Sequence, residues 1–97
     1  MTRVIHADLR LIQTPGGLQA YLGFLLNAPA YYGHNLDALH DILTDVSEPT
    51  RLIITFPSSC APDMSRYLLR LSRVLEDSSR ENPFFSWESK DFGPTPR

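Results

Sequence analysis

The sequence predicts an α/β fold with one small parallel sheet. Three short segments of the 97-residue chain are rich in β-branched, aliphatic or aromatic residues, as strands usually are. Between them lie segments in which apolar residues recur with the spacing of a helix. Strands that alternate with helices usually join through right-handed crossovers into a parallel sheet. Hydrophobic residues make up 42% of the chain, which is enough for one modest core, so we expect a single domain.

The N-terminal part contains a predicted strand and a predicted helix. β-Branched residues indicate a short strand over residues 2–6. Thr14 followed by Pro15 is typical of a helix start, because Thr caps free backbone N–H groups and Pro fits the first turn. A buried stripe with i, i+3, i+4, i+7, i+8 spacing then comprises Leu18, Tyr21, Leu22, Leu25 and Leu26. We expect this helix to end near Asn27, since Pro29 cannot continue it.

A second amphipathic helix is predicted to begin after Asn35. The side chain of Asn35 can accept a hydrogen bond from a backbone N–H that the first turn leaves unpaired. At about 100° per residue, the apolar side of the helix consists of Leu36, Ala38, Leu39, Ile42 and Leu43. The polar side consists of Asp37, His40, Asp41, Thr44 and Asp45. Residues 28–33 form the loop that leads into this helix.

The C-terminal half adds two strands and a third helix. A nearly continuous apolar run predicts a central strand over residues 51–56, and such a run is typical of a parallel strand covered on both faces. After a loop over residues 57–62, Asp63 begins a third helical pattern. Its buried side consists of Met64, Tyr67, Leu68, Leu71, Val74 and Leu75. Residues 83–88 are predicted to form the last strand, since Pro is tolerated where a strand begins.

Composition indicates where the domain ends and in which cellular compartment the protein works. We expect residues 1–90 to form the domain, and residues 91–97, where Gly and Pro gather, to form a loose C-terminal tail. The single Cys60 cannot form an internal disulfide, which argues against a secreted domain stabilised by disulfides and fits a reducing cytoplasm. The sequence contains no apolar run typical of a signal peptide or a membrane span, so we expect a soluble cytoplasmic protein.

The charge distribution separates one segment from the rest of the chain. The formal net charge is only −2, but residues 11–50 contain no Lys or Arg, and Asp37, Asp41, Asp45 and Glu48 all lie there. A nucleic-acid binder needs a basic stripe that displaces counterions from phosphate, and a peripheral membrane protein needs a basic patch. We therefore expect neither nucleic acid nor membrane as a partner.

The polar side of the second helix is the strongest functional signal. The helix dipole stabilises Asp37 in the first turn, but Asp41 and Asp45 follow at i+4 and i+8, and each like-charge pair costs about 0.2–0.5 kcal/mol. An ordinary solvated face is one interpretation, and a face for a cationic protein partner is the one we favour. Phosphate-handling sites of nucleases are cationic surfaces of this kind. Tyr31 and Tyr32 could anchor the contact, although either could instead pack in the core beneath the loop.

Other chemistries receive little support from the sequence. His and Asp residues within 34–41 include metal-ligand types, but their spacing is not diagnostic of a metal site. Cys60 lacks the signature of a catalytic nucleophile, and the acidic pairs of a glycosidase would need a groove that so short a chain hardly provides. The stripe of Arg66, Arg70 and Arg73 is short and lacks interleaved aromatic residues. We therefore expect no metal, no cofactor and no catalysis.

One run of residues matches a known family. The loop and second helix contain Tyr31-Tyr32-Gly33-His34-Asn35-Leu36-Asp37-Ala38-Leu39-His40-Asp41, followed by Leu43-Thr44. This run resembles the Tyr-Tyr-Gly-x-Asn-Leu-Asp-Ala-Leu-x-Asp core of the barstar family of ribonuclease inhibitors, and a looser similarity extends to about Ser89. The resemblance implies a three-stranded parallel sheet packed by three to four helices. It also implies a protein that plugs the active site of a secreted or injected guanyl-preferring ribonuclease and so protects the producing cell.

The resemblance also implies roles for individual residues. Asp41 would be the principal mimic of an RNA phosphate, and Asp37 would be a second anionic contact. Tyr31 would be the aromatic lid against the nuclease. The remaining roles are a turn permitted by Gly33 and supporting contacts from Asn35 and Thr44.

Several positions differ from the best-known family pattern. His40 stands where a Trp is familiar, Val46 replaces an aromatic side chain, and Arg80 falls where an acid would support the interface. These differences concern the identity of the target more than the mode of binding. Glu76 aligns with an interface acid of the family, but it could equally pair with Arg73 or Arg80 on its own helix.

We therefore expect a non-enzymatic inhibitor of a ribonuclease of the extracellular, guanyl-preferring type, and we expect it to be a monomer when free. The expected partner-binding residues are Tyr31, Tyr32, Gly33, Asn35, Asp37, His40, Asp41, Thr44, Val46 and Glu76. The alternative is a regulatory interaction module that binds a basic non-nuclease protein through the same face.

Overall fold

Three parallel strands alternate with three helices in the computed structural model, which describes residues 2–90. The elements are β1 (Arg3–Asp8), α1 (Pro15–Leu25), α2 (Leu36–Thr44), β2 (Thr50–Thr55), α3 (Pro62–Glu81) and β3 (Phe85–Lys90). The predicted α/β fold with a three-stranded parallel sheet is confirmed. The predicted loose tail, residues 91–97, lies outside the described residues.

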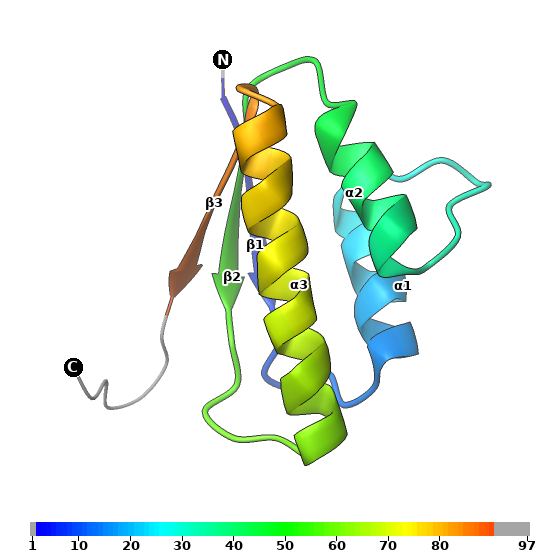
Figure 1. The fold of residues 1–97 in the computed structure, drawn as a ribbon, viewed down its shortest axis with the longest axis vertical. Helices are drawn as coiled ribbons and strands as arrows, with labels where there is room; N and C mark the ends of the chain where they lie inside the picture. The colour runs from blue at the N-terminus through cyan, green and yellow to red at the C-terminus, as the bar shows by residue number, and fades with distance from the viewer. Residues whose placement is uncertain (1, 91–97) are drawn as a thin grey trace.

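The strand order determines where the helices lie. The sheet has the order β1-β2-β3, so both crossovers step in the same direction across it. Crossovers of the same hand that step in the same direction place their helices on the same face of a sheet. Figure 1 shows α1, α2 and α3 on one side of the sheet. Within residues 2–90, no helix therefore covers the opposite face of the sheet.

The predicted central parallel strand is present as β2, but it is fully buried on one face only. The buried residues of β2 are Thr50, Leu52 and Ile54, and its half-buried residues are Arg51, Ile53 and Thr55. On the open face, Val4 of β1 lies beside Arg51 in the register and is 49% exposed, and Arg51 forms an ion pair with Glu88 of β3. The apolar run suggested coverage of both faces, but Ile53, which lies on the open face, is only half-buried.

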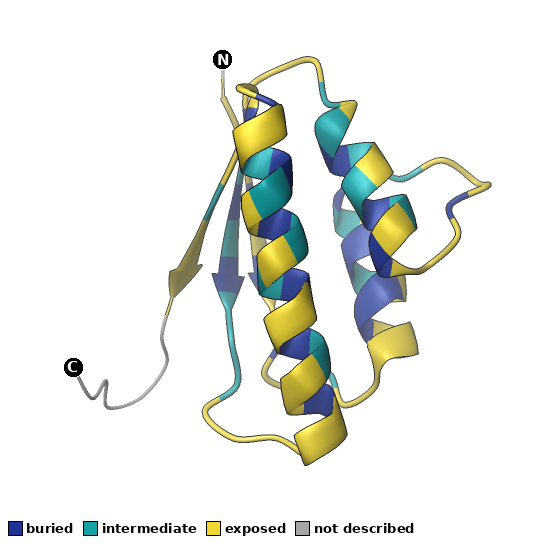
Figure 2. Ribbon diagram, viewed as in Figure 1, coloured by how far each residue is buried: buried dark blue, intermediate teal, exposed yellow. Residues whose placement is uncertain are grey.

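The core lies between the sheet and the three helices. Figure 2 shows buried residues along the inward sides of the helices and in the middle strand. The largest fully buried apolar side chains are Leu9, Leu18, Leu22, Leu39, Leu43, Leu52, Ile54, Leu71, Leu75 and Phe85. Full burial of such a side chain contributes about 1.5–3 kcal/mol. The predicted apolar stripes of the helices supply most of this core.

The ends of α1 follow from its sequence. The Thr14 side chain accepts a hydrogen bond from the Gly17 N–H at 3.0 Å, which confirms the predicted cap. At the other end, Asn27 adopts a left-handed backbone conformation with φ 57°. The Asn27 N–H donates to the Phe24 carbonyl and the Ala28 N–H donates to the Gly23 carbonyl, which is the hydrogen-bond pattern of a Schellman motif. The chain then leaves α1 toward the loop before α2.

Candidate functional site

The start of α2 is fixed by the side chain of Asn35. Its Oδ1 accepts a hydrogen bond from the Ala38 N–H at 2.7 Å, and its Nδ2 donates to the Gly33 carbonyl at 3.2 Å. The left-handed residue of the turn is His34, with φ 55°, and not Gly33. A Cβ on Gly33 would lie 3.1 Å from Asn35 Nδ2. Gly33 thus leaves room for the capping side chain, while His34 supplies the left-handed residue of the turn.

The predicted division of α2 into two sides is confirmed. Leu36, Leu39 and Leu43 are buried and face the core, where α2 packs mainly against α3. The outward carboxylates are Asp37, Asp41 and Asp45, and all three are exposed. We call these three residues the acidic face. Residues four apart in a helix lie about 6 Å apart along its axis and about 40° apart around it, so the acidic face is a slanting row of like charges.

Thr44 lies beside the acidic face but bonds to its own helix. Its Oγ1 donates to the His40 carbonyl at 2.8 Å and lies 3.3 Å from the Asp41 carbonyl. These carbonyls belong to the last turns of α2, where some carbonyls have no helical partner. Thr44 therefore stabilises the end of the helix, and its side chain is half-buried.

The carboxylates of the protein fall into two groups. Within residues 2–90, the carboxylates paired with a basic side chain are Asp8, Asp63, Glu76, Asp77, Glu81 and Glu88. Each carboxylate of the basic-free segment, namely Asp37, Asp41, Asp45 and Glu48, has no ion pair with any described residue. In one of these pairs, hydrogen bonds from Arg10 lower the pKa of the Asp8 carboxyl to about 2. The unpaired negative charge is thus concentrated on α2 and the residues after it.

The two adjacent tyrosines have different environments. Tyr31 is 88% exposed at the tip of the loop, whereas Tyr32 is 9% exposed and belongs to the core. The Tyr32 hydroxyl donates to Gln19 Oε1, and burial raises the pKa of Tyr32 to about 12. Its ring packs edge-on against His34, with ring centroids 5.0 Å apart. Tyr31 is therefore exposed to a partner. The burial of Tyr32 favours the alternative that it packs in the core beneath the loop, although it also lines the groove described next.

A groove joins the loop to the acidic face. It has a volume of about 700 Å³ and lies between the loop and the outward side of α2. Its lining includes Tyr31, Gly33, Asp41, Ile42 and Asp45. Aromatic, apolar and anionic groups thus meet in one concave surface. Such a surface suits a protein partner that presents a cation next to apolar or aromatic groups.

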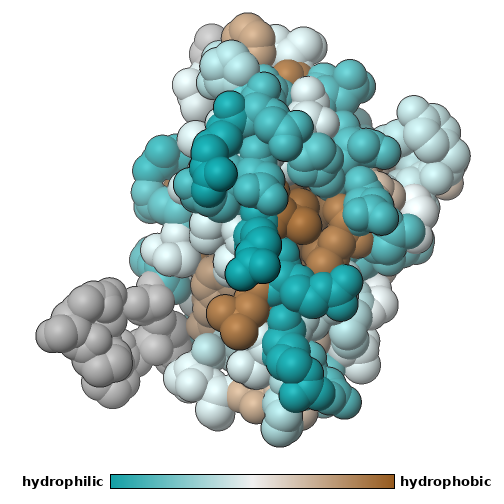
Figure 3. Space-filling model, viewed as in Figure 1, coloured by the Kyte–Doolittle hydropathy of each residue, from teal (hydrophilic) through white to brown (hydrophobic). Residues whose placement is uncertain are grey.

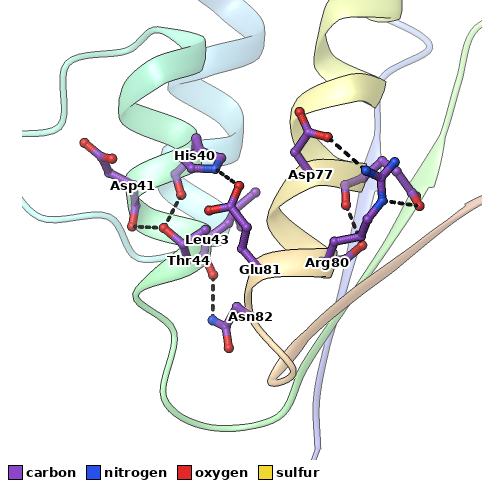
Figure 4. Close-up of polar contacts among 10 residues, drawn as sticks. His40, Asp41, Leu43, Thr44, Asp77, Arg80, Glu81 and Asn82 are labelled. Carbon is purple, nitrogen blue, oxygen red and sulfur yellow. Dashed lines mark hydrogen bonds and ion pairs between the residues drawn. The ribbon is translucent and has the colours of Figure 1, made fainter.

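On its other side, α2 contacts the C-terminal end of α3. His40 Nε2 lies 3.1 Å from Glu81 Oε2, and Figure 4 shows the two side chains pointing toward one another from the two helices. Figure 3 shows hydrophobic surface gathered between α2 and α3, with hydrophilic surface around it. His40 is half-buried, and Glu81 is exposed. Glu81 is a neighbour of α2 that the sequence did not indicate.

Glu76 lies on a different side of α3. Its carboxylate accepts a hydrogen bond from Trp87 Nε1 at 3.2 Å and lies 3.7 Å from Arg80 Nε. Arg80 also lies 3.7 Å from Asp77. Among the described residues, no hydrogen bond or ion pair connects Glu76 to α2. The contacts thus favour the second of the two interpretations of Glu76, a partner of Arg80 on its own helix.

Asn82 ties the end of α2 to the turn between α3 and β3. Its side-chain Nδ2 donates to the Leu43 carbonyl and to the Val46 carbonyl, both at 2.9 Å, and its Oδ1 accepts from the Phe84 N–H at 2.9 Å. The contact to Leu43 is drawn in Figure 4. Asn82 is 5% exposed, so these bonds replace water for the groups involved. Val46 is half-buried, and its carbonyl is one of these acceptors.

The other candidate residues lie outside the groove. Among residues 2–90, no three His, Cys, Asp or Glu side chains are grouped so that they could hold a metal ion. Cys60 is exposed, as are Arg66, Arg70 and Arg73. No helix in the described part of the chain is long and apolar enough to cross a membrane.

Comparison with known proteins supplies one further finding. The family model described as Barstar (barnase inhibitor) matches residues 2–91, a range that contains every helix and strand of the structure. A comparison with curated proteins gives no match.

Proposed function

We propose that this chain inhibits a ribonuclease, since it belongs to the family described as Barstar (barnase inhibitor). The loop before α2 and the acidic face would cover the active site of the enzyme. In this proposal Asp41 takes the place of an RNA phosphate, Asp37 makes a second anionic contact, and Tyr31 covers the nuclease as a lid. The target is a guanyl-preferring ribonuclease of the secreted or injected type. The inhibitor acts in the cytoplasm and protects the cell that makes it.

The single observation that carries the proposal is the pairing of the carboxylates. Asp37, Asp41 and Asp45 are exposed and unpaired among the described residues, although the like-charge spacing costs about 0.2–0.5 kcal/mol per adjacent pair. Arg, Lys and His side chains that hold phosphate in a nuclease would supply the missing countercharges. Binding then relieves a repulsion that the free protein contains. Two of these carboxylates, Asp41 and Asp45, also line the groove beside the loop.

Tyr31 adds contact area to this electrostatic attraction. An exposed Tyr combines a large apolar ring with one hydroxyl and has few rotatable bonds, so little entropy is lost when it is held in a contact. Its place beside Asp41 in the same groove lets one partner surface meet both residues. In this proposal Val46 and His40, which do not line the groove, make further contacts that differ between targets.

Inhibition of RNA cleavage tests the proposal directly. Purified protein mixed with a guanyl-preferring ribonuclease should abolish cleavage at a near-stoichiometric ratio, and a ribonuclease encoded next to this chain is the preferred target. Asp41→Ala should weaken inhibition by about 10- to 100-fold, because it removes a charged contact worth about 1.5–3 kcal/mol. Asp63→Ala is the matched control: it makes the same change in net charge at a carboxylate on α3 that is paired with Arg66. Equal losses in the two variants would contradict the proposal.

The salt dependence of association provides a second measurement. Exposed charges are screened beyond about 10 Å at 0.1 M ionic strength, so the association rate should fall steeply as salt rises. If no ribonuclease is inhibited and affinity capture from the native organism yields a basic non-nuclease protein, the alternative of a regulatory interaction module is supported instead.

A further inference from the structure

The loop that carries Tyr31 is held from beneath by a buried chain of polar groups. Gln19 of α1 is fully buried, and its amide contacts two tyrosines. Its Oε1 accepts from the Tyr32 hydroxyl, and its Nε2 donates to the Tyr67 hydroxyl of α3 at 2.6 Å. A buried amide with both ends satisfied fixes the orientation of its neighbours, because any other arrangement would leave a polar group unpaired. Tyr32 is thereby connected to α1 and, through Gln19, to α3.

The ring of Tyr32 is held by a second, independent feature. A Cβ on Gly23 of α1 would lie 3.0 Å from Tyr32 Cδ2 and 3.1 Å from Tyr32 Cε2. The ring therefore packs directly on the backbone of α1, in a space that exists only because residue 23 has no side chain. Gly23 is not in a left-handed conformation, so close packing and not backbone geometry accounts for it. Glycine inside a helix is otherwise unfavourable by about 1 kcal/mol relative to Ala.

We propose that Gln19 and Gly23 are positioning residues of the inhibitory surface: together they hold Tyr32, and Tyr32 holds its neighbour Tyr31 at the edge of the groove. This inference rests on the proposed function. Both residues are buried in α1, so they act on a partner only through the loop. The exposed Tyr31 has no such support of its own, since it is 88% exposed. Its position depends on the residue that follows it.

Two glycine substitutions in α1 give a matched pair for the test. Gly23→Ala places a methyl group against the Tyr32 ring, whereas Gly16→Ala places one where no atom lies within 4 Å. Both substitutions remove a helical glycine, so any general gain in helix stability occurs in both. In the free protein, hydrogen exchange of the backbone amides of residues 28–34 should be at least about tenfold faster in Gly23→Ala than in Gly16→Ala, while amides of α3 should exchange alike. Equal exchange in the loop would overturn the proposal.

Inhibition of the ribonuclease supplies the functional readout. Gly23→Ala should weaken inhibition by at least about tenfold relative to Gly16→Ala, and this loss should shrink to less than about twofold when Tyr31→Ala is already present. A merely structural role would give the same loss in both backgrounds, and that result would refute the proposal. If the unmodified protein inhibits no ribonuclease, the proposed function fails, and the exchange measurement still decides whether Gly23 positions the loop.

A second variant guards against misfolding of Gly23→Ala. Tyr67→Phe removes only the hydroxyl that accepts from Gln19 Nε2, on a helix that does not carry the loop. It should increase exchange in residues 28–34 in the same direction and should weaken inhibition only while Tyr31 is present. Unchanged exchange and unchanged inhibition in Tyr67→Phe would show that Gln19 does not transmit the position of α3 to the loop, and the role given to Gln19 would be withdrawn.

Discussion

Substitution of Asn82 should destabilise the protein more than any surface change, although Asn82 touches no residue of the acidic face. Its amide Nδ2 donates to the carbonyls of Leu43 and Val46, and its Oδ1 accepts from the Phe84 N–H. The end of α2 leaves carbonyls without helical partners, and two acceptors at this end depend on one side chain. Asn82→Ala removes all three bonds and leaves their partners in a site that is 5% exposed.

The expected loss follows from the number of bonds. Each contributes a net of about 0.5–1.5 kcal/mol, so the free energy of unfolding should fall by about 1.5–4.5 kcal/mol. A domain of this size is typically stable by about 5–15 kcal/mol, so the loss is a substantial fraction of the total. Asn82→Asp is the matched control, because it keeps the size and the acceptor for Phe84 but has no donor at neutral pH. It should be at least as destabilising as Asn82→Ala, since a carboxylate oxygen would face two carbonyl oxygens.

Urea denaturation followed by circular dichroism measures both variants. The midpoint should shift at an unchanged slope if the folded and unfolded states keep their compactness. If the free energy of unfolding of Asn82→Asp lay within about 0.5 kcal/mol of that of the original protein, the reasoning would be refuted. The hydrogen bonds from Asn82 to the Leu43 and Val46 carbonyls would then contribute nothing to stability.

Three further outcomes are expected. Ser78→Ala should leave the free energy of unfolding unchanged or raise it by up to about 1 kcal/mol in urea denaturation, since the buried Ser78 Oγ has no hydrogen-bond partner in the described structure. Asp45→Asn should raise it by about 0.2–1 kcal/mol by removing a negative charge that repels Asp41 and opposes the helix dipole, while Asp63→Asn, which loses a partner, should not. Because burial raises the pKa of Tyr32 from 10.0 to about 12, the stability that its neutral form contributes is present below pH 10 and is lost toward pH 12. Tyr32→Phe should remove that part of the alkaline loss, as followed by phenolate absorbance and unfolding at each pH.

The elements of the fold could be predicted because their signals are local. Thr14 and Asn35 cap their helices through atoms three residues away, and the apolar side of α2 follows from its own periodicity. The parallel sheet follows from strands that alternate with helices. Coverage of the sheet could not be predicted in the same way, because it depends on the order β1-β2-β3, which the apolar run of residues 51–56 does not encode.

The candidate site could be predicted only in part for the same reason. The acidic face was visible in the spacing of its charges. Which tyrosine is buried was not, since the answer depends on Gly23 and Gln19 in another helix. Similarly, Glu76 and Glu81 are separated by about 140° around α3, and the packing of α3 on α2 decides which of them reaches His40.

The proposed inhibitory surface comes from one uninterrupted stretch of chain, because residues 31–45 contain both Tyr31 and the whole acidic face. Recombination within a short piece of the gene could therefore replace this whole segment. Such a replacement could change the target while the pairing of β1 with β2 stays intact. A replacement segment must meet two conditions to fit the rest of the protein. It must bring a tyrosine whose hydroxyl can reach Gln19, and it must end α2 with a carbonyl that Asn82 can reach.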